Sequence, residues 1–383
     1  MSCDISIVIP TSDRVKLLEN VLYALNEQTC KSFEVIIVDD GSTDGTKQLV
    51  EHFNSLFTLR YIYVDKQQGN GASHSRNIGI DMAAGEIIIF LDSDSLVHKD
   101  FVAEHYRFHQ AHSNLAVVGI RWNLLPAEID KELIKKGFTR EDMPVDNLDK
   151  QNRMFQFFSY NMSQFSVPWW FFSTSNASVR KEALLSAGKF DEQFGKYILY
   201  EDTEIAYRLY KNSTKFVINA NTECYHLYHE VDLKSKLELS KGNIDYFQKK
   251  YPDDKDIALL EVIKEAAPVK NEDHTWLSYI KKAVNGTKYT TNVLKVTNYI
   301  IPVKNQWTEL KEFLDKTNIR EDAELIRAIV LDMGSMDNTD IMIQLYASTF
   351  KLLYWPIKCE SLQEAFAIGR KKVLSGAIVE VSL

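Results

Sequence analysis

The chain has 383 residues, of which 45% are hydrophobic and 26% charged, and its formal net charge is -8 at pH 7. This length and composition predict a globular protein of two or three domains. The negative charge argues against a nucleic acid as partner, because proteins that bind phosphate backbones carry a basic surface. An anionic substrate would need local cations or a metal ion.

The four cysteines are scattered and form no CxxC pair, which is typical of proteins from a reducing compartment. The first residues, MSCDISIVIP, lack the basic leader and the long apolar segment of a signal peptide. The apolar runs are also shorter than the roughly 20 residues of a membrane span. We expect a cytoplasmic protein without a transmembrane segment, and the sequence leaves peripheral membrane association open.

The first hundred residues alternate between predicted strands and helices. Segments rich in apolar residues, typical of buried parallel strands, occupy 5–10, 33–38, 59–65 and 87–91. A helical pattern follows each of the first three runs. This alternation predicts an α/β fold with a Rossmann-like, mostly parallel sheet flanked by helices.

Polar residues follow three of these runs: Thr11, the pair Asp39–Asp40, and Asp92–Asp94. Sheets of this kind bind their ligands beyond the carboxyl ends of the strands. The sequence therefore places a candidate site at that edge.

The middle of the chain is less regular. Residues 124–166 are rich in charged and then aromatic residues, and we expect loops and short helices over the site. A strand followed by a helix is expected within 167–194, an amphipathic helix over 200–212, and a strand leading to histidines over 214–230. The following residues, to about Thr290, look helical, charged and linker-like.

The tail repeats the beginning of the chain in weaker form. TNYIIPVKNQWTELKEFL resembles DISIVIPTSDRVKLLENVL, IRAIVLDMGSMDNTD resembles FEVIIVDDGSTDGTK, and AFAIGRKKVLSGAIVEVSL weakly follows SHSRNIGIDMAAGEIIIFL. Any two strand–helix units share part of such a pattern, which is the alternative explanation. We predict a first domain at 1–240, a helical linker at 241–292 and a smaller, degenerate α/β half copy at 293–383.

Asp92 and Asp94 are candidates for a metal site. They lie one residue apart where the apolar run 87–91 ends, and their oxygens suit Mg²⁺ or Mn²⁺ that bridges phosphates. Alternatively, the carboxylates bind backbone N–H groups in an Asx-turn or a helix N-cap. Charge beside a buried strand is costly without a cation or donors to compensate it, which favours the metal site.

Two further acidic motifs have a structural and a functional interpretation. In VDDGSTDGT, a carboxylate at the strand end can accept from the N3–H of uracil, while Ser42 or Asp44 can cap the next helix. Glu201 and Asp202 stand at a predicted helix start, where the dipole stabilises negative charge by about 0.3–1 kcal/mol. One of them can instead be a general base, worth roughly 10²–10⁴ in rate.

In chain order, the motifs PTSDR, VIIVDDGSTDGT, SRNIGI, FLDSD and GKFDEQFGKYILYEDTEIAYRL resemble those of family 2 glycosyltransferases with the GT-A fold. The stretch that ends in CYHLYHE is similar to bacterial polysaccharide polymerases of the chondroitin-synthase type, and YED to the ED motif of β-1,4-galactosyltransferases. The resemblance covers residues 1 to about 240, and its strength lies in the order of five motifs.

The resemblance implies roles for the residues at the nucleotide. Thr11 and Asp40 would contact the nucleoside, with Asp40 on the base and Asp39 nearby. Arg76 would approach the nucleotide, although a surface arginine on a helix is the alternative. Residues 92–94 would form the DXD motif of the family. Asp92 and Ser93 would contact the donor near its ribose, and Asp94 would be a ligand of the metal.

The resemblance also implies catalytic and acceptor residues. Asp202 would be the catalytic base and Glu201 would orient the acceptor. His226 would complete the metal shell together with Asp92 and Asp94, with His229 as the fallback and a purely structural histidine as the alternative.

Aromatic and polar residues in 167–176 are candidates for the acceptor site. Trp169 and Trp170 could stack on sugar rings, although core packing is the alternative for one of them, and Asn176 matches a region beside the acceptor pocket. His105, His109 and His112 lie at helical spacing with no carboxylate interleaved among them, so we expect a solvated helix face.

The resemblance implies a metal-dependent, inverting transfer of a hexosyl or N-acetylhexosaminyl group from a nucleotide sugar, with a UDP-sugar as first choice. The acceptor would be a hydroxyl of a glycan, a lipid-linked oligosaccharide or a peptide, as in polysaccharide biosynthesis. Mn²⁺ or Mg²⁺ would stabilise the charge on the leaving group.

Two other classes stay open. A sugar nucleotidyltransferase would want a Gly-rich basic loop after the first strand, where the chain has PTSDRVK. A non-catalytic pseudoenzyme would bind a glycan or nucleotide sugar without turnover, but the intact DSD and ED motifs argue against it. In the tail, Met333 replaces Asp40 and no DSD is present, so we expect acceptor binding, bracing of the catalytic domain or a homodimer through this part.

Overall fold

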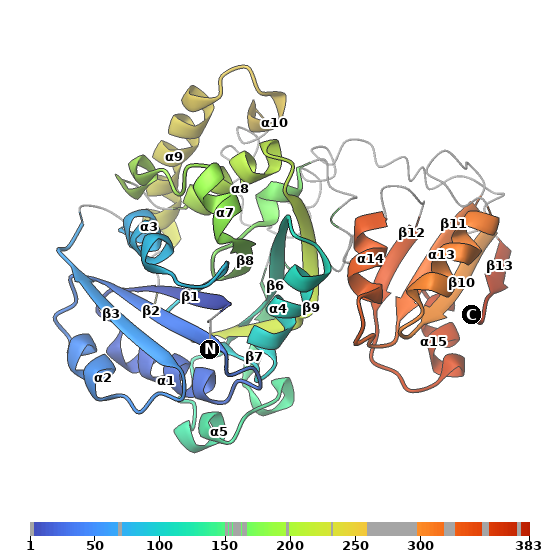
Figure 1. Cartoon of the computed structure of the whole chain (residues 1–383), viewed down its shortest axis with the longest axis horizontal. Coiled ribbons are helices and arrows are strands. Elements are labelled where there is room, and N and C mark those ends of the chain that lie inside the picture. The colour runs from blue at the N-terminus through green and yellow to red at the C-terminus, as the bar shows by residue number, and fades with distance from the viewer. Residues whose placement is uncertain are drawn as a thin grey trace. The chain divides into compact units, whose positions relative to one another are not determined.

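The computed structural model describes residues 4–67, 71–149, 152, 155, 162, 167–196, 199–230, 233–258, 297–317, 326–346, 352–373 and 377–383. Its contacts divide the chain into two units (Figure 1). The first comprises Met1–Asn152 and Trp169–Ile280, and the second Arg153–Pro168 and Lys281–Leu383. None of the described helices is long and apolar enough to cross a membrane.

The first unit contains a nine-stranded sheet in the order β3-β2-β1-β4-β8-β6-β9-β5, with β7 paired to β6. Its first four strands are parallel to one another: β1 (Ile5–Thr11), β2 (Phe33–Asp40), β3 (Thr58–Val64) and β4 (Ile87–Leu91). All residues of β2 and β4 are buried, because helices cover both faces of this part of the sheet. These strands confirm the expected mostly parallel α/β architecture.

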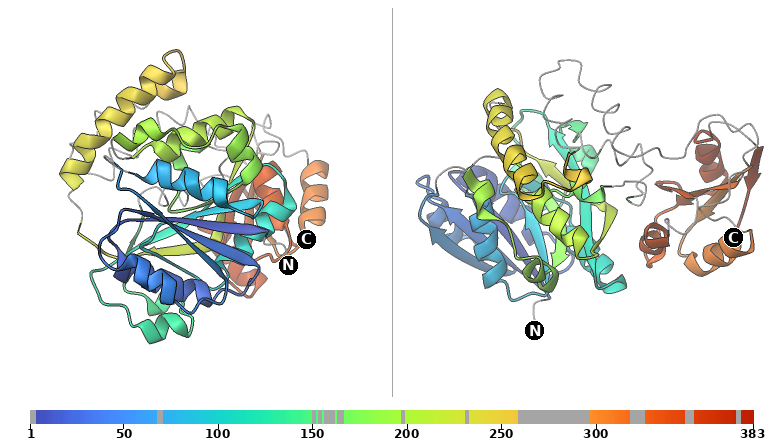
Figure 2. Two further views of the ribbon diagram at one scale, coloured as in Figure 1. Left: turned by 60° about the vertical axis from the view of Figure 1, so that its left-hand side comes forward. Right: turned by 90° about the horizontal axis from the view of Figure 1, so that it is seen from above.

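Helices connect these strands on the two faces of the sheet. α1 (Val15–Asn26) and α2 (Thr46–His52) lie on one face and α3 (Ala72–Met82) on the other (Figures 1 and 2). On α3, Gly79 touches β1 so closely that a Cβ would come within 2.3 Å of a methyl group of Val8. Glycine is therefore required for the close approach of α3 to the sheet.

The second half of the sheet brings the chain back to the same edge. It comprises β5 (Ser95–Val97), β6 (Leu115–Leu124), β7 (Val145–Leu148), β8 (Asn176–Arg180) and β9 (Lys215–His226). Strand β8 is antiparallel to β4 and β6, whereas β9 is parallel to β6 and antiparallel to β5. Strand β9 has a bulge, because Val118 pairs with Ile218 but Ile120 pairs with Glu223.

Further helices of the first unit are α4 (Phe101–Ala111), α5 (Lys131–Lys135), α7 (Lys181–Ser186), α8 (Glu201–Lys211), α9 (Leu233–Lys250) and α10 (Lys255–Ala258). Short 3₁₀ helices cover Arg140–Asp142, Pro168–Phe171 and Glu192–Lys196. The strand expected after residue 166 thus begins only at Asn176.

The histidines of α4 differ from the expectation of a solvated face. His105 and His109 are buried, and both hydrogen-bond the hydroxyl of Ser178 on β8 at 2.8 Å. Their neutral rings pack against the sheet like apolar residues, and burial lowers the pKa of His105 to about 4 and that of His109 to about 3. His112, beyond the helix end, is half-buried.

The second unit is a four-stranded parallel sheet in the order β12-β11-β10-β13. Its elements are β10 (Thr297–Val303), α13 (Trp307–Lys316), β11 (Ile326–Asp332), α14 (Thr339–Tyr346), β12 (Leu352–Pro356), α15 (Leu362–Arg370) and β13 (Ala377–Glu380). The order repeats β3-β2-β1-β4, and the register repeats too: Thr11 pairs with Asp39, and Val303 with Asp332. The second unit thus has the strand order and register of the first four strands of the large sheet, and the half repeat stays a prediction.

Candidate active site

A cleft of about 730 Å³ opens at the carboxyl ends of β1, β2 and β4 in the first unit. The predicted residues that line it are Thr11, Asp40, Arg76, Asp92, Ser93, Asp94, Glu201 and His226. The fold thus collects side chains from distant parts of the sequence at one edge of the sheet, as open α/β sheets do.

Asp39 and Asp40 have separate structural environments. Asp39 is buried, and its carboxylate accepts hydrogen bonds from the Ser42 N–H at 2.9 Å and the Tyr61 hydroxyl at 2.6 Å. Asp40 lines the cleft and accepts from the Gln67 N–H at 2.8 Å. Asp39 therefore fixes the turn after β2, while Asp40 faces the space for a ligand.

The N-terminal end of α3 comes very close to Asp40. A Cβ at Gly71 would lie 2.4 Å from the Asp40 Oδ2 atom, so only glycine leaves this carboxylate in place. On β1, the buried Thr11 Oγ1 has no hydrogen-bond partner among the described residues. Asp40 and Thr11 therefore offer polar groups to a ligand at the cleft end formed by β1 and β2.

Arg76 joins α3 to the two acidic motifs. Its Nη1 lies 3.1 Å from Glu201 Oε1 and its Nη2 lies 3.5 Å from Asp92 Oδ1. The guanidinium is buried and lies 5.7 Å from the centre of the Phe190 ring. Burial and the nearby Asp94 raise the pKa of Asp92, and the positive charge of Arg76 opposes this shift.

Asp94 lies against two histidines from the end of β9. The pairing of Ser95 with His226 brings that strand end to the DSD motif. Asp94 Oδ2 is 3.6 Å from His226 Nε2 and 3.2 Å from His229 Nε2. One ligand atom from each of the three residues lies within 4.8 Å of the other two.

The chemistry of this trio fits a divalent cation. Burial and the charge of Arg121 lower the pKa of His226 to about 4, so its ring is neutral near pH 7. Burial would raise the pKa of Asp94, but the hydrogen bond from His229 and the nearby positive charges hold it at about 2. Asp94 Oδ1 is buried and has no hydrogen-bond partner among the described residues. An ionised carboxylate and a neutral imidazole are the ligand forms that cations bind.

The trio differs in one member from the predicted metal set. Asp92 faces Arg76 and does not belong to the group of three, whereas His229, the fallback candidate, does. His226 ends β9, and His229 joins it beside Asp94 from the residues that follow the strand.

Glu201 and Asp202 begin α8 with different surroundings. Glu201 lines the cleft, and its Oε2 is buried without a hydrogen-bond partner among the described residues. Asp202 is not among the cleft-lining residues and accepts from the Thr203 N–H at 2.8 Å. Burial and the charge of Glu201 raise the pKa of Asp202 to about 7, against the opposing charge of Arg76.

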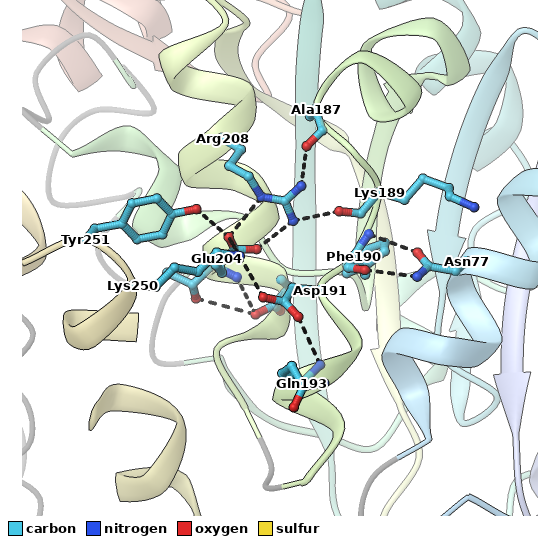
Figure 3. Close-up of polar contacts among 12 residues, drawn as sticks. Asn77, Ala187, Lys189, Phe190, Asp191, Gln193, Glu204, Arg208, Lys250 and Tyr251 are labelled. Carbon is cyan, nitrogen blue, oxygen red and sulfur yellow. Dashed lines mark hydrogen bonds and ion pairs between the residues drawn. The ribbon is translucent and has the colours of Figure 1, made fainter. Parts of the chain in front are cut away.

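A buried polar network holds α8 in place (Figure 3). The fully buried Glu204 contacts Arg208 at 2.6 Å, Lys250 at 2.9 Å and the Tyr251 hydroxyl at 2.7 Å. Lys250 also contacts Asp191 at 2.6 Å. These contacts join α9 to α8 and to the loop before the 3₁₀ helix Glu192–Lys196, and Asn77 ties that loop to α3 through two hydrogen bonds with the Phe190 backbone.

The backbone just before Glu201 is strained and held from α9. Leu199 and Tyr200 have φ values of 66° and 72°, which residues other than glycine rarely adopt. The buried Asn243 donates to the Leu199 carbonyl at 2.6 Å and the Phe194 carbonyl at 3.0 Å. A left-handed pair beside a candidate catalytic residue is the kind of strain that functional sites retain.

The three predicted acceptor residues lie outside the cleft lining. Trp169 is fully buried, and its ring contacts those of Trp170 and Tyr207. Asn176 is also buried and donates to the backbone carbonyls of Ile120 and Thr222, which clamps the bulge of β9. The aromatic and amide side chains therefore stabilise the sheet behind the cleft.

Three cations of the cleft were missed in the sequence. Arg14, Lys66 and Arg121 all line it. Arg14 follows the first strand directly and could have been found there, since the other site residues were recognised by the same position. Lys66 follows the third strand in the same way, whereas Arg121, within β6, reaches the cleft through the strand order of the sheet, which no local pattern reveals.

Comparisons with known proteins agree with this geometry. A family model described as Glycosyl transferase family 2 matches residues 6–185. The glycosyltransferase YfnE of Bacillus subtilis (strain 168) is 29% identical over 278 residues, which are 64% of this chain and 70% of that protein.

Two further relatives are larger than the matched region. Validoxylamine A glucosyltransferase of Streptomyces hygroscopicus subsp. jinggangensis (strain 5008) is 27% identical over 261 residues, 65% of this chain and 61% of the enzyme. Chondroitin synthase of Escherichia coli is 29% identical over 241 residues, 58% of this chain and 34% of the synthase. The chain thus spans less than two thirds of both relatives.

The family match contains the strand-end motifs and the DSD motif. With the α/β architecture and the site at the expected edge of the sheet, these findings identify the matched part of the chain. Residues 6–185 form a domain of the Glycosyl transferase family 2.

Proposed function

We propose that the chain is a metal-dependent, inverting glycosyltransferase that moves a hexosyl or N-acetylhexosaminyl group from a UDP-sugar to an acceptor hydroxyl. The observation that carries this proposal is the joint position of Asp40, Arg76 and the trio Asp94, His226 and His229 in one cleft. They supply a nucleoside contact, a cation for the nucleotide and a metal site.

The nucleotide would lie along the cleft from β2 toward β9. Asp40 would accept from the base, and Thr11 and Arg76 would approach the nucleoside and its phosphates. The names of relatives, such as chondroitin synthase and validoxylamine A glucosyltransferase, support sugar transfer to a hydroxyl of a glycan or a smaller acceptor.

Asp94, His226 and His229 would hold the divalent ion. Imidazole ligands suit transition metals more than Mg²⁺, which favours Mn²⁺. A bound ion would neutralise charge on the diphosphate as it leaves.

Asp202 is our proposed base and Glu201 the group that orients the acceptor. A pKa of about 7 for Asp202 is suited to a base that works near neutral pH. Glu201 is ion-paired to Arg76, which holds its carboxylate at the cleft. A single displacement with Asp202 on the acceptor side would invert the anomeric configuration.

The second unit has, in our proposal, no donor site of its own. Its register places Met333 where Asp40 stands, and the equivalent glycines 79 and 369 place Phe366 where Arg76 stands. Ser382 takes the position of Asp92. This half would then serve the acceptor, brace the first unit or form a homodimer contact.

The test is calorimetric titration of UDP with and without Mn²⁺. The unaltered protein should bind UDP more tightly with Mn²⁺, and Asp94→Asn should lose at least about tenfold in metal-dependent affinity. Asp100→Asn, outside the cleft lining at the start of α4, is the matched control and should bind as the unaltered protein does. Equal UDP affinity with and without Mn²⁺ in the unaltered protein would refute the metal role.

A further inference from the structure

Arg14 shares the carboxylate of Asp94 with the two histidines. Its Nη1 donates to Asp94 Oδ2 over 2.9 Å, and the same oxygen lies 3.2 Å from His229 Nε2 and 3.6 Å from His226 Nε2. The arginine side chain is 32% exposed, whereas Asp94 is 8% exposed. A partly exposed cation of the cleft lining therefore contacts a buried carboxylate that we assign to the metal.

The backbone under Arg14 is fixed. Asp13, with φ 50°, donates its N–H to the Ser42 hydroxyl and accepts from the Thr43 N–H, each at 2.8 Å. The Val15 N–H donates to Asp44 at 2.8 Å. Both neighbours of Arg14 are thus hydrogen-bonded to the turn after β2. Arg14 can therefore reach a new partner only by rotating its own side chain.

The second unit shows that this turn does not need an arginine. Asn305 repeats Asp13: its φ is 56°, its N–H donates to the Ser335 hydroxyl at 2.9 Å, and its side chain accepts from the Met336 N–H at 2.7 Å. The residue that follows it is Gln306. The second unit therefore forms the same turn with Gln306 in place of the arginine, which separates Arg14 from the folding of the loop.

We propose that Arg14 makes metal binding and nucleotide binding interdependent. The guanidinium competes with a divalent cation for Asp94 until a nucleoside diphosphate in the cleft provides another anionic partner. This inference rests on the proposed function of the same cleft.

The physical basis is charge repulsion in a partly buried site. A divalent cation on Asp94 would lie beside the positive guanidinium, and such repulsion is strong where water is largely excluded. A diphosphate relieves it, because arginine binds phosphate oxygens in a bidentate fashion and the metal binds others.

The other neighbouring cations are placed differently. Lys66 faces Asp40 at 3.6 Å, and Arg76 is held by Glu201 and Asp92. Among the described residues, Arg14 is the arginine that forms an ion pair with Asp94, so the coupling is assigned to it.

The coupling can be measured without turnover. Free Mn²⁺ is followed by electron paramagnetic resonance during titration, with and without saturating UDP. In the unaltered protein UDP should tighten Mn²⁺ binding. Arg14→Met should tighten Mn²⁺ binding without nucleotide by roughly tenfold, and the effect of UDP should shrink, as should the reciprocal effect of Mn²⁺ on UDP affinity.

Two variants complete the experiment. Arg14→Gln introduces the residue that the second unit has at this position and serves if Arg14→Met fails to fold. Lys16→Met removes one charge from an exposed position on α1 and should leave both affinities unchanged.

Unaltered Mn²⁺ affinity in the folded Arg14 variants would overturn the inference, as would equal tightening in Lys16→Met. Absence of Mn²⁺-dependent UDP binding in the unaltered protein would instead refute the proposed metal site itself.

Discussion

Asp39 and Asp40 are adjacent, and comparison with the second unit indicates that they have different roles. In the second unit Asp332 occupies the place of Asp39 and accepts from the Ser335 N–H at 2.8 Å and the Tyr354 hydroxyl at 3.2 Å. The position of Asp40 there holds Met333. A carboxylate retained in both copies with the same partners stabilises the turn, and one found only beside the cleft is available to a ligand.

We expect Asp39→Ala to lower the free energy of unfolding by about 1–3 kcal/mol, because the Ser42 N–H and the Tyr61 hydroxyl lose their acceptor. Asp40→Ala should instead weaken UDP binding by about tenfold or more, since a charged hydrogen bond contributes about 1.5–3 kcal/mol. Chemical denaturation and calorimetry measure the two effects. A stable Asp39→Ala protein with weak UDP binding would reverse the assignment.

The pair Glu201 and Asp202 predicts a pH profile. Burial and Glu201 raise the pKa of Asp202 to about 7, and a base must be ionised to act, so the rate of donor hydrolysis should rise with pH through about 7. Glu201→Gln removes a negative neighbour and should move this rise to lower pH. Asp202→Asn should lose roughly 10²–10⁴ in rate and keep UDP binding. A profile that stays the same in Glu201→Gln would contradict the role of Asp202.

At the scale of elements, α9 lies where the sequence suggested a linker. Asn243, Lys250 and Tyr251 hold the loop before α8 and α8 itself. The helical, charged pattern of this segment was visible, but its partners Glu204 and Asp191 are over 40 residues away. Such contacts follow from the tertiary fold and leave no local periodicity.

We expect Lys250→Met to destabilise the first unit by about 1–3 kcal/mol, because Asp191 loses an ion-pair partner and the buried Glu204 keeps, among the described residues, Arg208 as its remaining cation. Lys249→Met, at an exposed position of the same helix, should change stability by less than about 0.5 kcal/mol. Urea unfolding compares the variants. Equal stabilities would show that the network contributes nothing to α8.

The strands β1, β2, β3 and β4 were predictable because buried parallel strands are continuously apolar and alternate with helices. The residues at their carboxyl ends were predictable for the same reason. The position of β8, antiparallel between β4 and β6, could not be predicted, because strand order depends on pairings between distant segments. The buried histidines of α4 were also missed, because a neutral histidine bonded to Ser178 packs like an apolar residue.

At the scale of the whole molecule, His105 and His109 make stability depend on pH. Burial lowers the pKa of His105 to about 4 and that of His109 to about 3, below the value of about 6.5 in an unfolded chain. Unfolding therefore takes up protons as pH falls below about 6.5. Each histidine should reduce the free energy of unfolding by about 1.4 kcal/mol per pH unit, down to its folded pKa.

His109→Gln should make the free energy of unfolding fall less steeply with pH, because one of the two buried histidines no longer contributes. Denaturant unfolding between pH 7 and pH 4 measures this change. His52→Gln, at an exposed position of α2, is the control and should keep the full slope. The same slope in both variants would show that the buried ring does not control acid stability.

The two sheets of the chain share a backbone framework but differ in the side chains at their edges. The second unit has Gly334 and Gly369 at the places of Gly41 and Gly79, the left-handed Asn305 at that of Asp13, and a turn carboxylate in Asp332. The two units agree where the chain must bend and differ at the positions of Asp40, Arg76 and Asp92, where the second unit has Met333, Phe366 and Ser382. The backbone of this fold can therefore form without the polar side chains of the cleft.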